Sequence, residues 1–262
     1  MPGDQLPLGL DTAAPDAAAA APGDSGPRVP LPLATTQPGA AQLGAPALSP
    51  LPERVAPMRP TDGDAPFDDP GYFFEPWWPG IRAQAFVEGR QVRLRAEALS
   101  DPTAAFPELA ALPGLLTRDG VVLDVILLVL DATTRPNTTF LNQRLDAPTK
   151  TTKLLGSAAL VAQDLLYLGG RSLADRPFGE RRAELAALMT PSAWCLPGRG
   201  FVGDGIAVAN ALGEMGFRGV SARRLDARLR AGPAGDAWYR VPVAPRQRDL
   251  PPFLAIFSKL PL

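Results

Sequence analysis

Apolar and polar residues alternate between residues 73 and 96 in a pattern that predicts antiparallel strands. Residues 73–75 and 81–88 are expected to form strands, and residues 91–96 are expected to pair with the second of them. Gly89 and Arg90 separate these two segments. A two-residue connection that contains glycine is typical of a β-hairpin, so the first ordered part of the chain is predicted to be sheet.

From residue 106 to residue 243, the chain contains long apolar runs and segments whose apolar residues have the spacing of a helix. Residues 121–131 are apolar apart from Asp124 and the final Asp131, which predicts a long buried strand or a strand pair. Residues 160–168 predict another buried strand. The other predicted elements are a short helix from Phe106, helices at 177–189 and 204–215, the second ended by Gly216, and strands at 219–223 and 238–243. Strands grouped in hairpins with helices between them predict an α+β fold of antiparallel sheets with flanking helices.

Composition divides the chain into three parts. Residues 1–50 are rich in Ala and Pro and are predicted to be a disordered tail, because they offer too little apolar surface to offset chain entropy. Residues 51–243 form the predicted domain, and residues 244–262 a short C-terminal extension. The start of the chain lacks the pattern of a secretory signal, and its apolar runs are too short to span a membrane. We therefore expect a cytoplasmic protein without membrane contact.

Charge and residue usage exclude several kinds of chemistry. The formal net charge is -1, so the chain as a whole has no strong attraction to nucleic acid. Histidine is absent, which removes the commonest general base and metal ligand, and no metal site is expected. The lysines are Lys150, Lys153 and Lys259. Cys195 has no second cysteine to pair with and no histidine to activate it, so we expect it to be a small buried apolar residue.

The stretch from Phe73 to Arg82 reads Phe-Phe-Glu-Pro-Trp-Trp-Pro-Gly-Ile-Arg. It resembles the first signature of ATP-dependent DNA ligases, Glu-Pro-Lys-Trp-Asp-Gly-Ile/Phe-Arg, whose lysine takes up AMP. Further segments occur in the family's order: Phe106-Pro-Glu-Leu109, Asp164-Leu-Leu-Tyr-Leu168, Gly170-Arg-Ser-Leu173, Glu180-Arg-Arg182 and Arg223-Arg-Leu-Asp226. The resemblance implies the ATP-grasp-like nucleotidyltransferase fold of the ligase adenylation domain. The residues after 243 are too few for the oligonucleotide-binding barrel that ligases carry next, so we expect none.

The residues that perform chemistry in that family are replaced at the matching positions. Trp77 stands where the family has its nucleophilic lysine, and an indole nitrogen has no free lone pair with which to attack phosphorus. The other replacements are Pro79 for aspartate, Glu97 for arginine, Ile126 for a metal-site carboxylate, Gln163 for the adenine-stacking aromatic, Arg218 for glutamate, and Arg223, Arg240 and Pro242 for lysines. The resemblance therefore implies a pseudoenzyme without a cofactor; ATP and magnesium would be needed only by an active form.

Two sets of residues keep or replace the family's nucleotide contacts. Glu75 and Arg82 match the family and are expected to be either a remnant of nucleotide binding or structural hydrogen-bonding residues. Trp77 and Trp78 are expected to fill the core or the pocket rather than to stack on a ligand. We expect Trp77 and Ile126 to lie together and to fill the nucleotide pocket with apolar side chains.

The resemblance implies an inactive DNA-ligase-like domain that serves as a DNA-binding or accessory module in DNA repair, with DNA-repair proteins as further partners. The expected DNA surface consists of Arg218, Arg223, Arg224, Arg228, Arg230 and Arg240. Binding would be weak and not sequence-specific, through phosphate contacts. One alternative is a divergent active ligase or nucleotidyltransferase that uses a relocated lysine. The other is a protein-protein scaffold without a nucleic-acid role.

Overall fold

The computed structural model describes residues 49–97, 99, 101–146 and 155–260. All but the last two residues of the predicted tail lie outside these described residues, as do Lys150 and Lys153. Within the described residues, no helix is long and apolar enough to cross a membrane.

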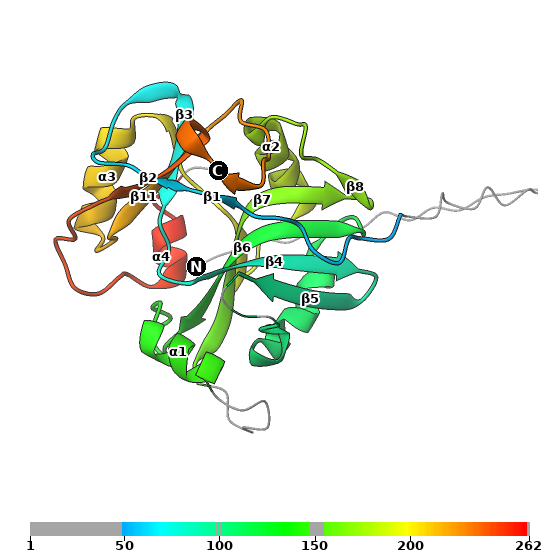
Figure 1. The fold of residues 1–262 in the computed structure, drawn as a ribbon. Helices are drawn as coiled ribbons and strands as arrows, with labels where there is room; N and C mark the ends of the chain where they lie inside the picture. Colours follow the sequence, from blue (N-terminus) through cyan, green and yellow to red (C-terminus); the bar gives the residue numbers. More distant parts are fainter. Residues whose placement is uncertain (1–48, 98, 100, 147–154, 261–262) are drawn as a thin grey trace, which may run out of the picture. The chain divides into compact units, whose positions relative to one another are not determined.

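A six-stranded sheet forms the larger layer of the domain (Figure 1). Its main path runs in the order β5-β4-β6-β7-β8, with antiparallel neighbours, and β9 pairs in parallel with β7. The strands are β4 (Ile81–Glu88), β5 (Gln91–Ala96), β6 (Val121–Leu130), β7 (Ser157–Leu168), β8 (Arg171–Ser172) and β9 (Cys195–Pro197). The predicted hairpin is thus confirmed, and the apolar run from residue 121 is one strand rather than a pair.

A five-stranded sheet, in the order β10-β3-β11-β13-β2, forms the second layer. Its strands are β2 (Thr61–Asp62), β3 (Asp69–Pro76), β10 (Phe201–Gly203), β11 (Gly219–Arg224) and β13 (Trp238–Pro242); a separate pair joins β1 (Met58–Arg59) to β12 (Gly232–Pro233). The predominance of antiparallel pairs in both sheets confirms the predicted α+β class.

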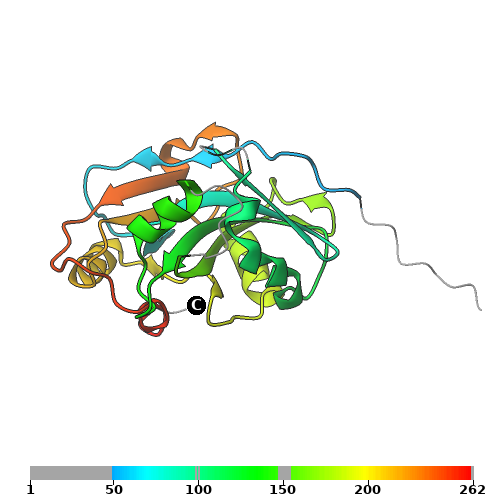
Figure 2. The ribbon, with the colours of Figure 1, turned by 90° about the horizontal axis from the view of Figure 1, so that it is seen from below.

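The helices are short and lie beside the sheets. They are α1 (Thr138–Asp146), α2 (Phe178–Leu188), α3 (Gly205–Glu214) and α4 (Phe253–Phe257), with 3-10 segments η1 (Thr103–Ala105), η2 (Pro107–Leu115) and η3 (Gly235–Ala237). The helix predicted from Phe106 is a 3-10 segment, and Pro113 within it cannot donate the hydrogen bond of an α-helix. Helices α1 and α4 were not predicted. Figure 2 shows α3 and α4 near one another, as in Figure 1.

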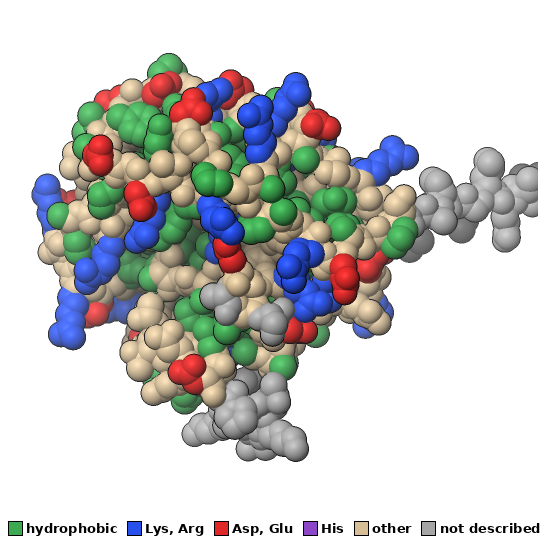
Figure 3. All heavy atoms as spheres, viewed as in Figure 1, with side chains coloured by type: hydrophobic (Ala, Val, Ile, Leu, Met, Phe, Trp, Pro, Cys, Tyr) green, Lys and Arg blue, Asp and Glu red, His purple; other side chains and the backbone are tan. Residues whose placement is uncertain are grey.

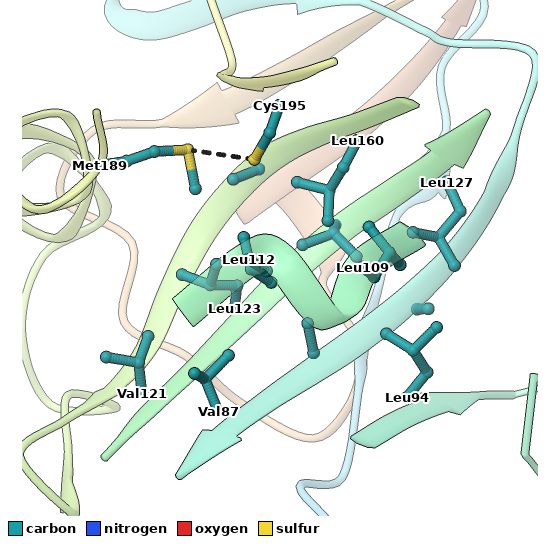
Figure 4. Close-up of a cluster of buried hydrophobic side chains, with 14 of the residues drawn as sticks. Val87, Leu94, Leu109, Leu112, Val121, Leu123, Leu127, Leu160, Met189 and Cys195 are labelled. Atoms are coloured by element: carbon teal, nitrogen blue, oxygen red, sulfur yellow. Dashed lines mark hydrogen bonds between the residues drawn. The ribbon is translucent and has the colours of Figure 1, made fainter. Parts of the chain in front are cut away.

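Strand β6 separates two different interiors, because successive side chains point to opposite faces. Alternate residues from Val121 to Val129 enter an aliphatic cluster with η2 and α2. Figure 4 shows Cys195 in this cluster, where its thiol donates to the sulfur of Met189 at 3.8 Å. Burial raises the pKa of the Cys195 thiol to about 12, and the expected role as a buried apolar residue is confirmed.

The C-terminal segment contributes to the second interior. Phe253, Ile256 and Phe257 of α4 are buried, and the rings of Phe257 and Trp78 stack with centroids 5.2 Å apart. The same cluster contains Leu128 of β6. Residues 253–260 therefore contribute to the core of the domain.

Candidate functional site

One face of the five-stranded sheet carries several of the residues that replace the family's chemistry. Residues paired across antiparallel strands point to the same side, and so do residues two apart along a strand. Across β3, β11 and β13, the inner row is Phe73, Arg223 and Trp238, and the next row is Glu75, Ser221 and Arg240. Trp77 and Gly219 follow at the outer end, where the amide of Trp77 donates to the Gly219 carbonyl at 3.0 Å.

The inner end of this face forms a buried ion-pair network with β7 and α2. Asp164 accepts two hydrogen bonds from Arg181, from Nε at 2.8 Å and from Nη2 at 2.7 Å. Arg223 lies 3.5 Å from Glu75 and 3.6 Å from Asp164, and it donates to Gln163 at 3.2 Å. All five side chains are buried. A charge this deep is tolerated only with partners, so these residues fix one another in place.

A second ion pair adjoins the network from β4 and β6. Arg82 donates to Asp124 from Nε at 2.8 Å and from Nη2 at 2.6 Å, and to the Met58 carbonyl at 2.6 Å. The ring centroid of Trp238 lies 4.6 Å from the Arg82 guanidinium and 3.9 Å from that of Arg223. The Trp238 indole also donates to the Ser221 hydroxyl at 2.9 Å. The two ion pairs are therefore connected through one buried ring.

Charges within this interior balance. The guanidinium groups of Arg82, Arg181 and Arg223 face the carboxyl groups of Glu75, Asp124 and Asp164. Burial raises the pKa of the Glu75 carboxyl above its ordinary value, and Arg223, Arg182 and the Ser221 hydroxyl offset part of the rise. Guanidinium groups do not act as nucleophiles or bases at ordinary pH. The arrangement is therefore suited to holding the two sheets together.

Little space remains between these groups. The cavity lined by Arg82, Asp164, Arg223 and Trp238 has a volume of about 10 Å³. Ligand pockets are on the order of 300–1,000 Å³, and even one water needs roughly 10–15 Å³. The cavity enclosed by these ion pairs therefore has no room for a nucleotide.

Glu75 and Arg82, the residues that match the family, are both engaged within the chain. Arg82 pairs with Asp124, and Glu75 faces Arg223 and accepts from Ser221 at 3.3 Å. Their contacts are those of structural hydrogen-bonding residues, the second of the two roles expected for them.

The prediction that Trp77 and Ile126 fill one pocket together is wrong. Ile126 is buried in the cluster that contains Trp78, Leu128 and α4, whereas Trp77 lies outside that cluster. Trp77 is half-buried against Trp238, with ring centroids 6.5 Å apart. Adjacent residues on an extended segment point in different directions, so Trp78 takes the core position and Trp77 does not.

Trp77 lines an open cleft at the outer end of the face. The cleft has a volume of about 740 Å³, and its wall includes Pro79, Arg218, Arg240 and the start of α1. The Arg240 guanidinium lies 5.0 Å from the centre of the Trp77 ring. Gly219 lets the start of β11 lie close to Trp77, because a Cβ at residue 219 would be only 3.2 Å from the Cβ of Trp77.

The six arginines predicted to form one DNA surface do not do so. Arg223 is only 4% exposed and is committed to the interior network, so it cannot contact DNA from this position. Arg224 pairs with Asp226 at 2.9 Å and with Asp236 at 2.5 Å. Residues 218, 228, 230 and 240 remain exposed. Figure 3 shows basic side chains dispersed among acidic ones on the face that it presents.

The last two replaced positions are Glu97, which lines a cavity with Arg82 and Asp124, and Pro242. Glu97 accepts from Arg59 at 2.6 Å, and this hydrogen bond lowers the pKa of the Glu97 carboxyl. Pro242 is exposed at the end of β13, opposite Gly219.

Arg181, Asp124 and Trp238 were not predicted to be site residues. Asp124 is the only charged residue of β6, and Arg181 lies among the buried positions of α2. A charged residue within an apolar pattern indicates a buried ion pair, and this signal was present in the sequence.

Comparison with known proteins identifies the family. Residues 65–197, about half of the chain, match the family model described as "ATP dependent DNA ligase domain". The chain therefore belongs to the ATP-dependent DNA ligase domain family.

Individual relatives agree with this assignment. The "Multifunctional non-homologous end joining DNA repair protein LigD" of Mycobacterium tuberculosis is 31% identical over 72% of this chain, and the match covers 24% of that protein. A "Probable DNA ligase" of Streptomyces avermitilis is 33% identical over 62% of this chain and 33% of its own length. The chain thus matches about a quarter of the length of the LigD relatives.

Solved structures show the same fold. The structure titled "mycobacterial DNA ligase D complexed with ATP and MES" has a TM-score of 0.60 at 29% identity, covering 72% of this chain and 60% of that one. The ligase domain of M. tuberculosis LigD has a TM-score of 0.58, covering 71% and 58%. The predicted ligase-type fold is thereby confirmed.

The residues of this chain do not fit the ATP and magnesium that the family implies. Trp77 offers no nucleophile, and the hydrocarbon side chain of Ile126 offers no oxygen to a metal ion. Arg223 and Gln163 are hydrogen-bonded to each other in the interior, and the cavity that Arg223 lines there measures about 10 Å³. Within the described residues, no group of three or more His, Cys, Asp or Glu side chains is arranged to hold a metal ion.

Proposed function

We propose that this domain is a non-catalytic member of its family, and that it serves as a DNA-binding accessory module in DNA repair. The observation that supports the loss of catalysis is the interior network. In it, Arg223 forms ion pairs with Glu75 and Asp164, and the cavity beside them measures about 10 Å³. Family membership and the names of the LigD relatives support the setting in DNA repair.

If the domain were an active ligase or nucleotidyltransferase, a lysine at another position would have to act as the nucleophile. Lys259 is exposed just after α4, a helix whose other side packs on Trp78. Adenylyl transfer needs an amine held beside a bound nucleotide and its metal ion. The surroundings of Lys259 therefore favour the non-catalytic proposal.

Exposed arginines support the DNA-binding part of the proposal. Arg228 and Arg230 lie on the loop before β12, and Arg218 and Arg240 line the cleft. None of these four has an ion-pair partner within the described part of the chain. Guanidinium groups form forked hydrogen bonds to phosphate oxygens, which favours binding to the backbone. With a net charge of -1, binding should be weak and strongly reduced by salt.

Incubation with radiolabelled ATP and Mg²⁺ or Mn²⁺ tests the loss of catalysis. We expect no acid-stable AMP adduct, while an active ligase assayed in parallel becomes labelled. Trp77→Lys alone should also remain unlabelled, because residue 126 has no carboxylate for a metal ion and Gln163 offers no aromatic ring to adenine. A stoichiometric adduct on Lys150, Lys153 or Lys259 would show that the domain is an enzyme.

Fluorescence anisotropy with nicked and intact duplexes tests DNA binding. We expect the two duplexes to bind alike, with an affinity that falls steeply between low and moderate salt. Arg228→Glu with Arg230→Glu should weaken binding. Arg90→Glu with Arg118→Glu, which reverses the same number of exposed charges at the β4–β5 turn and before β6, should change it less. If neither duplex binds at low salt, the protein-scaffold alternative replaces this part of the proposal.

A further inference from the structure

We propose that the cleft beside Trp77 binds an unpaired DNA strand, with a base against the indole and phosphates against the surrounding arginines. This inference rests on the proposed function and names its ligand and its site. The residues that carry it are Trp77, Arg218 and Arg240, with Arg135 and Arg248 also lining the cleft.

The shape of the cleft suits a flexible strand. Its volume of about 740 Å³ lies within the range of sites that hold small molecules, roughly 300–1,000 Å³. Its walls come from the β3–β4 connection, the start of α1 and the segment before it, the segment before β11, strand β13, and the segment before α4. In a duplex the bases are stacked on one another inside the helix. A base reaches the indole in this hollow only when its strand is unpaired.

The charges of the cleft favour an anion. Four arginines line it, at positions 135, 218, 240 and 248, against the two acidic residues Asp131 and Asp249. Asp131 is already engaged, since its carboxylate accepts from the amides of Thr133 at 2.7 Å and of Arg135 at 3.1 Å. The four guanidinium groups have no ion-pair partner within the described residues, and all four side chains are exposed. They are therefore available to phosphate oxygens.

The first turn of α1 adds hydrogen-bond donors to the same wall. Thr138 and Thr139 are exposed to the cleft, and this turn contains no acidic residue. Asn137 accepts from the Phe140 amide at 2.9 Å and so begins the helix. The positive end of the helix dipole consequently faces the cleft and agrees in sign with the arginines.

Trp77 makes the cleft suited to nucleic acid rather than to phosphate alone. Aromatic side chains beside basic groups bind unpaired strands by stacking on bases of any sequence. The ring of Trp77 is half-buried, and the Arg240 guanidinium lies 5.0 Å from its centre. Trp77 stands where the family has its nucleophilic lysine. The position that takes up AMP in the family would therefore contact a DNA base in this chain.

The test compares three fluorescein-labelled ligands: a single strand of thymidines, an abasic strand with the same number of phosphates, and a blunt duplex. We expect the thymidine strand to bind the full-length protein about 10-fold more tightly than the abasic strand. We also expect it to bind more tightly than the duplex.

Matched variants assign the preference to the cleft. Trp77→Ala should remove the difference between the thymidine and abasic strands, and Trp77→Phe should retain most of it. Arg218→Gln with Arg240→Gln should weaken binding of both strands and reduce the slope of log K against log salt by about 1.4. Arg90→Gln with Arg118→Gln, which removes the same number of exposed charges elsewhere, should leave the preference for the thymidine strand intact. Thermal unfolding of each variant shows whether it is folded.

The outcomes separate this inference from the proposed function. If the duplex binds as tightly as the thymidine strand, or if Trp77→Ala leaves the preference unchanged, the cleft inference is wrong while DNA binding by the domain stands. If no ligand binds at low salt, both DNA proposals are wrong, and the absence of adenylylation is unaffected.

Discussion

Arg223 and Arg240 occupy the two ends of one sheet face, and both stand where the family has lysine. At the inner end, Arg223 is 4% exposed and has Glu75 and Asp164 as partners. At the outer end, Arg240 is exposed, and its guanidinium lies 5.0 Å from the centre of the Trp77 ring. The same residue type is therefore a structural element at one end and an available cation at the other.

The difference between the two ends follows from desolvation. Removing a charge from water costs several kcal/mol, so a buried guanidinium is stable only beside a carboxylate. If one partner is removed, the desolvation free energy of the other charge is no longer compensated. An exposed charge keeps most of its hydration, contributes little to the free energy of unfolding and remains free to bind a ligand. We expect substitutions at the inner end to change stability and substitutions at the outer end to change binding.

Asp164→Ala is expected to have the largest effect. It leaves Arg181 and Arg223 buried with fewer partners, which should lower the free energy of unfolding by ~3–5 kcal/mol. Asp249→Ala, an exposed acidic residue on the cleft, is the control and should change it by less than ~0.5 kcal/mol. Urea unfolding measures both variants. Equal effects would remove the distinction between the two ends.

The two adjacent tryptophans give the next comparison. Trp78 is 3% exposed and stacks on Phe257, so Trp78→Ala should cost ~3–5 kcal/mol. Trp77→Ala should cost roughly half as much, because the half-buried ring loses fewer contacts. Thermal or urea unfolding of the pair measures the difference. A larger loss for Trp77→Ala would indicate that the cleft end is also part of the core.

Glu75 makes the inner end sensitive to pH. Its pKa is raised chiefly by burial, so the folded state holds this proton more tightly than the unfolded state does. Its contribution is fully present below the ordinary value of 4.5 and is lost as pH rises through the raised pKa of the folded state. Over that window the wild type should lose stability relative to Glu75→Gln, by at most ~1.4 kcal/mol per pH unit. Unfolding free energies of both proteins between pH 4 and pH 8 test this, and parallel curves would contradict it.

Arg240→Gln should have the smallest effect on stability. The exposed guanidinium contributes mainly its contact with Trp77, which at such sites amounts to ~0.5–1 kcal/mol or less. Arg223→Gln is the matched substitution at the inner end and should cost ~3 kcal/mol or more, because it leaves Glu75 without its ion pair. Comparable losses for the two arginines would show that position along the face does not decide their role.

Much of the fold could be predicted from local patterns. Strands β4 and β5 have the predicted bounds, because alternation and a two-residue turn fix a hairpin locally. Helices α2 and α3 lie within the predicted segments for the same kind of reason. Helix α4 was missed because its five residues are all apolar and show no periodicity, so its place depends on packing against Trp78.

The chemistry of the site divides in the same way. The sequence by itself determined that the nucleophilic lysine and the metal-site carboxylate are replaced, by Trp77 and Ile126, since residue identity limits what a side chain can donate. Only the tertiary structure decided which charges are free. Arg82 finds Asp124 across 42 residues, and Ser221 finds Glu75 across 146. These pairs meet because distant segments become neighbouring strands of one sheet, whereas Arg223 meets Asp164 because the two sheets pack. Burial there, rather than residue type, makes Arg223 part of the core and leaves Arg240 open to a ligand.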